Sequence, residues 1–190
     1  MIKLENISKS YGERAVLSDF SLSVADGERV CIVGASGCGK TTLLRIIAGL
    51  TVADGGSVNV TGASALMFQE PRLLPWKNAL DNILAVLNKE NFALADKYLC
   101  AVGLAADKEK MPDALSGGMA QRVAFARFLA YAEATDADVL LLDEPFSALD
   151  CDTASTMLSL LDSFTAGKTL ILVTHDDTHA EKLGARVVRM

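Results

Sequence analysis

The sequence predicts an α/β fold in which helices pack on a mainly parallel central sheet. Three short apolar runs carry this prediction, because each is followed by a polar loop and then by a segment of helical pattern. They occupy residues 30–33, 139–142 and 170–173. The N-terminal part instead favours a small antiparallel sheet, and residues from about 75 to 130 favour an inserted helical lobe. We expect a single domain over residues 1–190.

The antiparallel sheet is predicted from alternation and turns. Phe20, Leu22 and Val24 alternate with two serines, which is the pattern of a half-buried strand. A turn at 25–28 follows, and glycine-containing turns bracket a second short strand at 57–60. In the helical stretch 78–102, the predicted N-caps are Asn78 and Asn91, and Gly103 is predicted just past a helix end.

Composition excludes several classes of protein. A net charge of −6 argues against a nucleic-acid partner, because such proteins need a basic face for phosphates. The four cysteines have no metal-site spacing and are expected to be free thiols. The N-terminal residues do not resemble a signal peptide, and no apolar run is long enough to span a bilayer. We therefore expect that other chains form any membrane pore.

A phosphate-binding motif lies between a predicted strand and a predicted helix at 41–48. Glycines let backbone N–H groups surround phosphates, and the positive end of the helix points at the same anion. Lys40 is expected to reach the β- and γ-phosphates of a nucleotide, and the Thr41 hydroxyl to bind Mg²⁺. The predicted nucleotide-binding loop comprises Gly34, Ala35, Ser36, Gly37, Cys38, Gly39, Lys40, Thr41 and Thr42.

The apolar run at 139–142 ends in two carboxylates, Asp143 and Glu144. Asp143, at the strand tip, is expected to hold Mg²⁺ through water, across from Thr41. Glu144 should point to the other side of the backbone, where it can orient or deprotonate an attacking water. A strand that simply ends in polar residues is the alternative, which the neighbouring phosphate motif disfavours.

A second helix start suited to phosphate occurs at residues 115–119. Ser116 is a predicted N-cap, and Gly117 and Gly118 leave backbone amides open to an anion. One chain already has a phosphate loop, so this second one has no obvious use within the same monomer. We expect it to complete the nucleotide site of a neighbouring copy.

The ordered set of motifs resembles the ATP-binding subunits of ABC transporters over almost the whole chain. Residues 115–119 are similar to that family's signature, with Met119 in place of a glutamine. Tyr11 matches the aromatic residue that stacks on adenine, although it could be a simple strand-end aromatic. Gln69 looks like the Q-loop glutamine, and His175 matches the switch histidine. The fold implied is the P-loop ATPase cassette of that family.

This resemblance implies an ATPase that works as a head-to-tail dimer with ATP and Mg²⁺. Each ATP would lie between the phosphate loop of one chain and Ser116 and Gly118 of the other. Gln69 would contact the metal and the attacking water, and His175 the γ-phosphate. The implied partners are a second cassette, membrane permease subunits and a solute-binding protein, at the cytoplasmic face of the cell membrane.

Residues 69–76 look like the nitrate, sulfonate and taurine importer branch of the family, and Met119 fits that branch. Two readings of Leu73, Leu74 and Trp76 stay open, a docking groove for the permease or a seal on the helical lobe. Family members usually continue further past the switch histidine, so we expect a weaker sheet edge here.

Three alternatives remain open at the level of sequence. The first is a soluble, non-transport ABC ATPase, and the second a nucleotide-binding switch with little hydrolysis. The third concerns Cys38, which is either a small filler or a reactive thiol whose modification blocks nucleotide binding, since a helix start favours the thiolate. His179 is expected to lie at the surface.

Overall fold

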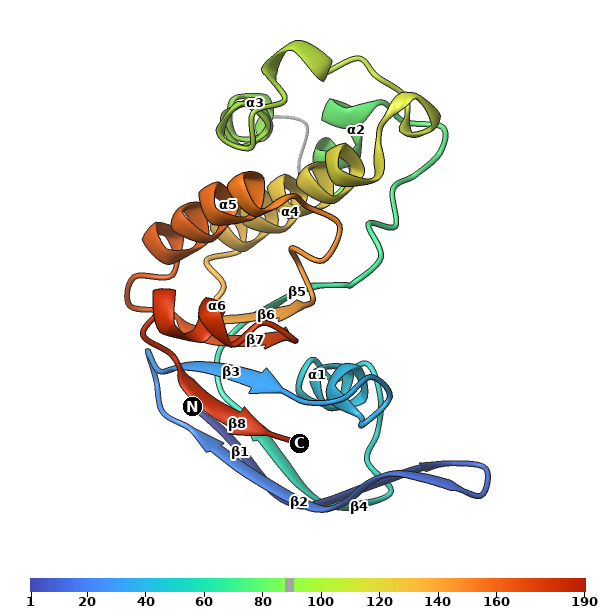
Figure 1. The fold of residues 1–190 in the computed structure, drawn as a ribbon, viewed down its shortest axis with the longest axis vertical. Coiled ribbons are helices and arrows are strands. Elements are labelled where there is room, and N and C mark those ends of the chain that lie inside the picture. Colours follow the sequence, from blue (N-terminus) through green and yellow to red (C-terminus); the bar gives the residue numbers. More distant parts are fainter. Residues whose placement is uncertain (88–90) are drawn as a thin grey trace. The chain divides into compact units, whose positions relative to one another are not determined.

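In the computed structural model, which describes residues 1–87 and 91–190, the elements divide into two units (Figure 1). The first unit comprises Met1–Leu66, Ala137–Glu144 and Thr165–Met190, and the second comprises Met67–Asp136 and Pro145–Phe164. The second unit includes more residues than the helical lobe that was expected at 75–130. Helix α5 (Cys151–Phe164) joins it, because Phe164 packs edge-to-face on Tyr98 with ring centroids 6.0 Å apart.

The first unit contains the predicted antiparallel sheet. Its strands are β1 (Ile2–Tyr11), β2 (Arg14–Val24) and β4 (Gly55–Val60), and β1 lies in the middle with antiparallel neighbours on both sides. The strand expected at 57–60 is confirmed and begins two residues earlier. Strand β1 was not predicted, although Ile2 and Leu4 are buried and alternate with exposed residues.

The same unit contains a five-stranded sheet with the order β5-β6-β7-β3-β8. The three apolar runs form its centre as β3 (Arg29–Val33), β6 (Val139–Asp143) and β7 (Thr169–Thr174), and β7 pairs in parallel with both others. Strands β5 (Ser64–Met67) and β8 (Arg186–Arg189) were not predicted. Because the central strands are parallel, their carboxyl ends lie at one edge of the sheet, where the predicted phosphate loop and acidic pair begin.

Two helices belong to this unit, α1 (Lys40–Ile47) and α6 (Asp177–Lys182). Helix α1 follows β3, as the sequence predicted, and ends before Gly49, which has a φ of +71°. One hydrophobic core joins α1 to both sheets, and its buried members include Ile2, Leu43 and Ile171. The phosphate loop is therefore anchored on both sides by buried elements, β3 before it and α1 after it.

The second unit is helical, with α2 (Ala79–Leu84), α3 (Phe92–Ala101), α4 (Gly117–Ala134), α5 and short 3₁₀ turns at Ala105–Asp107 and Pro112–Ala114. Asn78 is confirmed as an N-cap, since its side chain accepts the Asp81 N–H at 2.7 Å. Asn91 precedes α3 but makes no side-chain capping bond. Gly103 follows α3 with a φ of +74°, as expected for a residue just past a helix end.

Residues 88–90, which fall in the predicted helical stretch 78–102, lie outside the described residues. Over the part of the chain that is described, no helix has the length and apolar character needed to cross a membrane.

Candidate nucleotide-binding site

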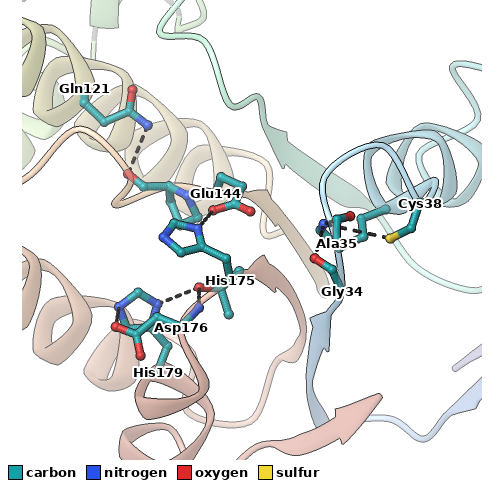
Figure 2. A network of polar contacts seen from close by, with 11 residues as sticks. Gly34, Ala35, Cys38, Gln121, Glu144, His175, Asp176 and His179 are labelled. Atoms are coloured by element: carbon teal, nitrogen blue, oxygen red, sulfur yellow. Dashed lines mark hydrogen bonds and ion pairs between the residues drawn. The ribbon is translucent and has the colours of Figure 1, made fainter. Parts of the chain in front are cut away.

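The phosphate loop runs from the end of β3 into the first turn of α1. Ala35, Ser36 and Gly37 are exposed, whereas Lys40 is buried with 7% of its surface accessible. The Lys40 ammonium donates to the carbonyls of Gly34 at 2.7 Å and Ala35 at 2.9 Å, and lies 3.9 Å from the Cys38 sulfur; these acceptors are labelled in Figure 2. The lysine therefore neutralises partial charges of its own loop, in the place where an anion would compete for it.

Gly39 is the residue on which this loop turns into the helix. Its φ is +107°, and a Cβ at this position would lie 2.8 Å from the Val16 carbonyl oxygen and 2.9 Å from the Leu17 Cδ2. Only glycine fits both the backbone angle and the space. The turn leaves the first N–H groups of α1 at the loop, where the helix dipole favours a negative charge.

The acidic strand end meets the start of α1. The Thr41 hydroxyl donates to the Asp143 Oδ2 at 2.6 Å. Asp143 is 3% exposed, and its Oδ1 is buried without a hydrogen-bond partner. Burial raises the pKa of Asp143, which the Thr41 hydrogen bond partly offsets. A buried carboxylate oxygen with an open lone pair is a position for a cation.

These residues fit Mg²⁺. The ion binds proteins through one or two carboxylates and takes its remaining ligands from water and substrate phosphates. No cluster of three or more His, Cys, Asp or Glu side chains suited to a metal occurs within residues 1–87 and 91–190. Asp143 and Thr41 together therefore match a metal that relies on the substrate for most of its ligands.

Glu144 and His175 form an ion pair or hydrogen bond beside this strand end. The His175 Nδ1 lies 2.6 Å from the Glu144 Oε2 (Figure 2). Glu144 has a φ of +48°, and its N–H donates to the Val173 carbonyl at 3.0 Å, which ties it to strand β7. A left-handed backbone at a non-glycine residue is uncommon and is concentrated at functional sites. The histidine side chain is 69% exposed, so it can turn away toward a ligand.

The expectation that His179 lies at the surface is wrong. Only 15% of its side chain is exposed, and its Nδ1 lies 2.9 Å from the Thr174 hydroxyl. The Nε2 lies 3.6 Å from the Asp176 carboxylate. The ring is covered because α6 turns back onto strand β3, and the helical pattern of so short a segment did not reveal which of its faces would be buried.

Tyr11 is the last residue of β1 and pairs with Arg14 across the hairpin. It is 50% exposed, and the Lys9 ammonium lies 5.6 Å from its ring centre. An exposed aromatic face at the end of a strand is available for stacking.

The other predicted site residues belong to the second unit. Gln69 is exposed in the loop after β5, two residues past its last residue. Ser116 is the N-cap of α4, where its hydroxyl accepts the Met119 N–H at 3.2 Å, as predicted. Gly117 is exposed, and Gly118 is half-buried beside the Ala148 carbonyl. The helix start thus has the open glycine backbone that an anion needs.

Two buried polar residues of this unit escaped the sequence analysis. Gln121, 1% exposed, donates from its amide to the Pro145 carbonyl at 3.0 Å, which fixes the chain just after the acidic pair (Figure 2). Asn82 is fully buried and bonds the backbone at Leu74 and Lys77. A polar residue on an otherwise apolar helix face is the signal that could have revealed both.

The sequence model of the family described as ABC transporter matches residues 17–147. The aliphatic sulfonates import ATP-binding protein SsuB of Ralstonia nicotianae is 46% identical over 197 residues, covering 98% of this chain and 68% of that protein. The protein of the same name from Cupriavidus necator is 44% identical, covering 98% and 65%. The chain thus spans about two thirds of the length of these relatives.

Two of the solved structures that share this fold are of the ATP-binding cassette MJ0796. One is a dimeric post-hydrolysis state bound to ADP and Pi, 31% identical with a TM-score of 0.90 over 100% of this chain and 94% of that one. The other is a dimeric structure of the same cassette, 32% identical with the same TM-score and coverage. These likenesses confirm the cassette fold and the family resemblance.

Proposed function

The chain belongs to the ABC transporter family, and we propose that it binds and hydrolyses ATP to drive a membrane permease that imports sulfonates or chemically similar anions. The observation that carries the ATPase part is the contact of Thr41 with Asp143, whose second oxygen is buried and open to a cation. The names of the relatives, aliphatic sulfonates import ATP-binding proteins, support transport over a soluble ATPase and favour sulfonates among the anions of the importer branch.

ATP binding would use the Lys40 ammonium, which in this structure donates hydrogen bonds to backbone carbonyls of its own loop. Lys40 exchanges the carbonyls of Gly34 and Ala35 for phosphate oxygens, because a full negative charge attracts the ammonium more strongly than a carbonyl does. The N–H groups at the start of α1 add donors along the helix dipole. Tyr11 would stack on the adenine.

Asp143 and Thr41 would hold Mg²⁺, with Gln69 as a further ligand. The ion supplies positive charge that stabilises the charge developing on the phosphates. Thr41 already holds Asp143 in a fixed orientation, so the carboxylate needs little rearrangement to receive a cation.

Hydrolysis would depend on Glu144 as the base. Its carboxylate takes a proton from the attacking water, the water oxygen bonds to the γ-phosphorus, and the bond to the β,γ-bridging oxygen breaks to release ADP. His175 now contacts the Glu144 Oε2 through Nδ1, and its exposed ring would turn to the γ-phosphate when ATP is bound. A hydrogen bond from the imidazole at that point would stabilise the charge that develops on the transferred phosphoryl group.

A second copy would complete each site through Ser116, Gly117 and Gly118. Their helix start is exposed and rich in free amides, yet this chain already has its own phosphate loop. The dimeric state of the MJ0796 structures supports a paired arrangement. Closure on ATP and opening after hydrolysis would then move the permease between two states.

The segment after Gln69 is our candidate for the permease contact, at the cytoplasmic face of the membrane. Trp76 is 71% exposed, so it does not seal the helical lobe by itself. The loop is stiff as well as exposed, since Arg127 donates to the carbonyls of Pro71 at 2.6 Å and Arg72 at 3.1 Å. A rigid loop that presents an aromatic side chain is suited to a protein contact. A solute-binding protein would deliver the anion to the permease.

The test is the solution mass and the ATPase activity of the purified chain and of Glu144→Gln. We expect Mg²⁺-dependent hydrolysis by the original chain, and at least a hundredfold lower turnover in the variant with retained ATP binding. The solution mass of the variant should double when Mg-ATP is added, because two copies associate. Unchanged turnover in Glu144→Gln would contradict the assignment of the base, and uptake of ¹⁴C-ethanesulfonate by cells with and without the chain tests the cargo.

A further inference from the structure

The strand end that carries His175 is closed into a turn by Thr174. Thr174 is buried, with 2% of the residue exposed, and its hydroxyl accepts the Asp176 N–H at 3.1 Å. This bond spans His175, so the switch histidine stands at the tip of a turn that a threonine hydroxyl holds together. The geometry of His175 therefore depends on the rotamer of the residue before it.

That rotamer is held by His179. The His179 Nδ1 lies 2.9 Å from the Thr174 hydroxyl, while its Nε2 faces the Asp176 carboxylate at 3.6 Å (Figure 2). The Thr174 oxygen already accepts a hydrogen bond from Asp176, so its single hydrogen is available to donate to Nδ1. Nε2 then carries the ring hydrogen toward the carboxylate. With this assignment the Thr174 hydroxyl accepts one hydrogen bond and donates one, and the Nε2 hydrogen lies on the side of the Asp176 carboxylate.

Asp176 joins the same cluster from the other side. Its carboxylate accepts the Thr178 N–H at 2.9 Å and so begins helix α6, which carries His179. The helix, the turn and the histidine ring are thus linked in a closed set of hydrogen bonds around His175. In such a set the position of one member depends on all the others.

We propose that His179 is a positioning residue for His175, acting through the Thr174 hydroxyl to hold the switch histidine against Glu144 and toward the phosphate. The proposal rests on the proposed ATPase function, and it assigns a role in it to a residue that does not touch the reacting atoms. Without the acceptor on His179, the threonine is free to change rotamer and the turn loosens. The Glu144–His175 distance of 2.6 Å would then no longer be fixed.

The charges around His179 set its protonation. Burial lowers the pKa of His179, and Lys182 and His175 act in the same direction. Asp176 and Glu144 oppose this effect. The elements against α6 add two further groups: Arg29 of β3 donates to the Leu183 carbonyl at 3.1 Å, and Arg189 of β8 pairs with Asp177 at 3.1 Å. The ring is therefore neutral at neutral pH, and it gains a hydrogen on Nδ1 only in acid, where it can no longer accept from Thr174.

Three variants separate positioning from a structural role. His179→Leu fills the space but accepts no hydrogen bond, His179→Asn restores an acceptor near the place of Nδ1, and Thr174→Val removes the donor. We expect His179→Leu and Thr174→Val each to lower kcat about tenfold with KM for Mg-ATP within about twofold. His179→Asn should recover most of kcat. The double variant should be no worse than Thr174→Val alone, because Thr174→Val already removes the bond to His179 together with the bond from the Asp176 N–H. Glu181→Ala, an exposed change on the same helix, is the matched control.

Two further measurements use the fact that the chain has only two histidines. NMR of the imidazole nitrogens should show His179 with hydrogen on Nε2, and His179→Leu should move the His175 signals toward those of a freely exposed histidine. In the pH profile of kcat, His179→Asn should lack the part of the acid limb that belongs to protonation of His179. That part of the profile lies at pH values below the ordinary histidine pKa of about 6.5.

The outcomes are distinct. Unchanged kcat and unchanged His175 signals in His179→Leu would overturn the proposal. So would a loss of kcat that asparagine does not recover and that accompanies a lower unfolding temperature, since this would mean a purely structural histidine. If the original chain hydrolyses no ATP, the proposed function fails, and the His175 signals still decide whether His179 positions that ring.

Discussion

Thr41 donates a hydrogen bond of 2.6 Å to Asp143, although 102 positions separate the two residues in the sequence. The bond joins the first turn of α1 to the carboxyl end of β6. It also leaves one carboxylate oxygen buried without a partner, which in a protein interior is an unfavourable arrangement. Both residues would gain from a cation, so the site is less stable when empty than when filled.

Asp143→Asn should stabilise the metal-free chain and abolish the response to Mg²⁺. Burial raises the pKa of Asp143, so the folded chain binds this proton more tightly than the unfolded chain does. The ionised carboxylate therefore costs stability at neutral pH, and the cost fades as the pH falls through the raised pKa toward the unfolded value of about 3.9. In EDTA at pH 7.5 we expect a gain of about 1 kcal/mol, seen as a melting temperature about 3 °C higher.

The pH series provides the control for this prediction. The difference in melting temperature between Asp143→Asn and the original chain should shrink as the buffer approaches pH 4. A variant that is less stable than the original chain at pH 7.5 in EDTA would contradict the cost assigned to the buried carboxylate. With ATP present, Mg²⁺ should raise the melting temperature of the original chain only.

Gly39→Ala should unfold more easily than the matched change Gly12→Ala. Both glycines have a positive φ, but a Cβ at residue 12 meets no atom within 4 Å, whereas one at residue 39 would lie 2.8 Å from the Val16 carbonyl oxygen. The backbone angle alone costs about 1 kcal/mol. The added overlap should bring the cost at residue 39 to roughly 3 kcal/mol. Urea denaturation measures both, and equal midpoints would show that the loop can move aside.

The central strands could be predicted because parallel strands covered on both faces read as continuous apolar runs. Strand β1 also alternates at Ile2 and Leu4, but its register shifts between Leu4 and Ile7, where Asn6 takes a φ of +54°. Such a bulge breaks the period-two pattern along the strand. Strand β8 gave no signal, since Val187 and Val188 stand between arginines at the sheet edge.

Some parts of the candidate site could likewise be predicted from the sequence, and others could not. The motif spacing predicted where the phosphate loop and the acidic pair lie in the fold, because the loop turns at a glycine that the backbone requires and the two carboxylates follow directly on an apolar run. The low exposure of the His179 side chain, 15%, could not be predicted, since it depends on how α6 folds back onto β3 and not on the helix itself. The roles of Tyr11, Gln69 and Ser116 stay predictions.

Ser116→Asp should separate helix capping from the contact with a second chain. Aspartate caps helices as well as serine does, so α4 should keep its stability, whereas Ser116→Ala should lose about 1 kcal/mol. In the Glu144→Gln background, however, the aspartate would put a negative charge where the partner's γ-phosphate is proposed to lie. We expect no doubling of mass on Mg-ATP in the Asp variant.

The matched control for this change is Asn78→Ala. Asn78 caps α2 in the same unit, so its loss should lower stability without affecting ATP-dependent doubling. Doubling that survives in Ser116→Asp would count against a phosphate contact at this helix start. Loss of doubling in Asn78→Ala would mean that stability of the helical unit, and not the signature contact, controls the dimer.

Alkylation of Cys38 should be slowed by ATP. Its sulfur lies 3.9 Å from the Lys40 ammonium inside the phosphate loop, and the side chain is only partly covered. A bound nucleotide would cover it, so ATP at ten times its Kd should slow the reaction about tenfold. Cys100 is exposed on α3 and should react at the same rate with and without ATP. Cys31 should stay unmodified, since it is buried and burial raises its pKa to about 12.

Mass spectrometry of the digested chain measures each thiol separately. Equal rates at Cys38 in the presence and absence of ATP, together with full ATPase activity after modification, would show that this residue is a small filler.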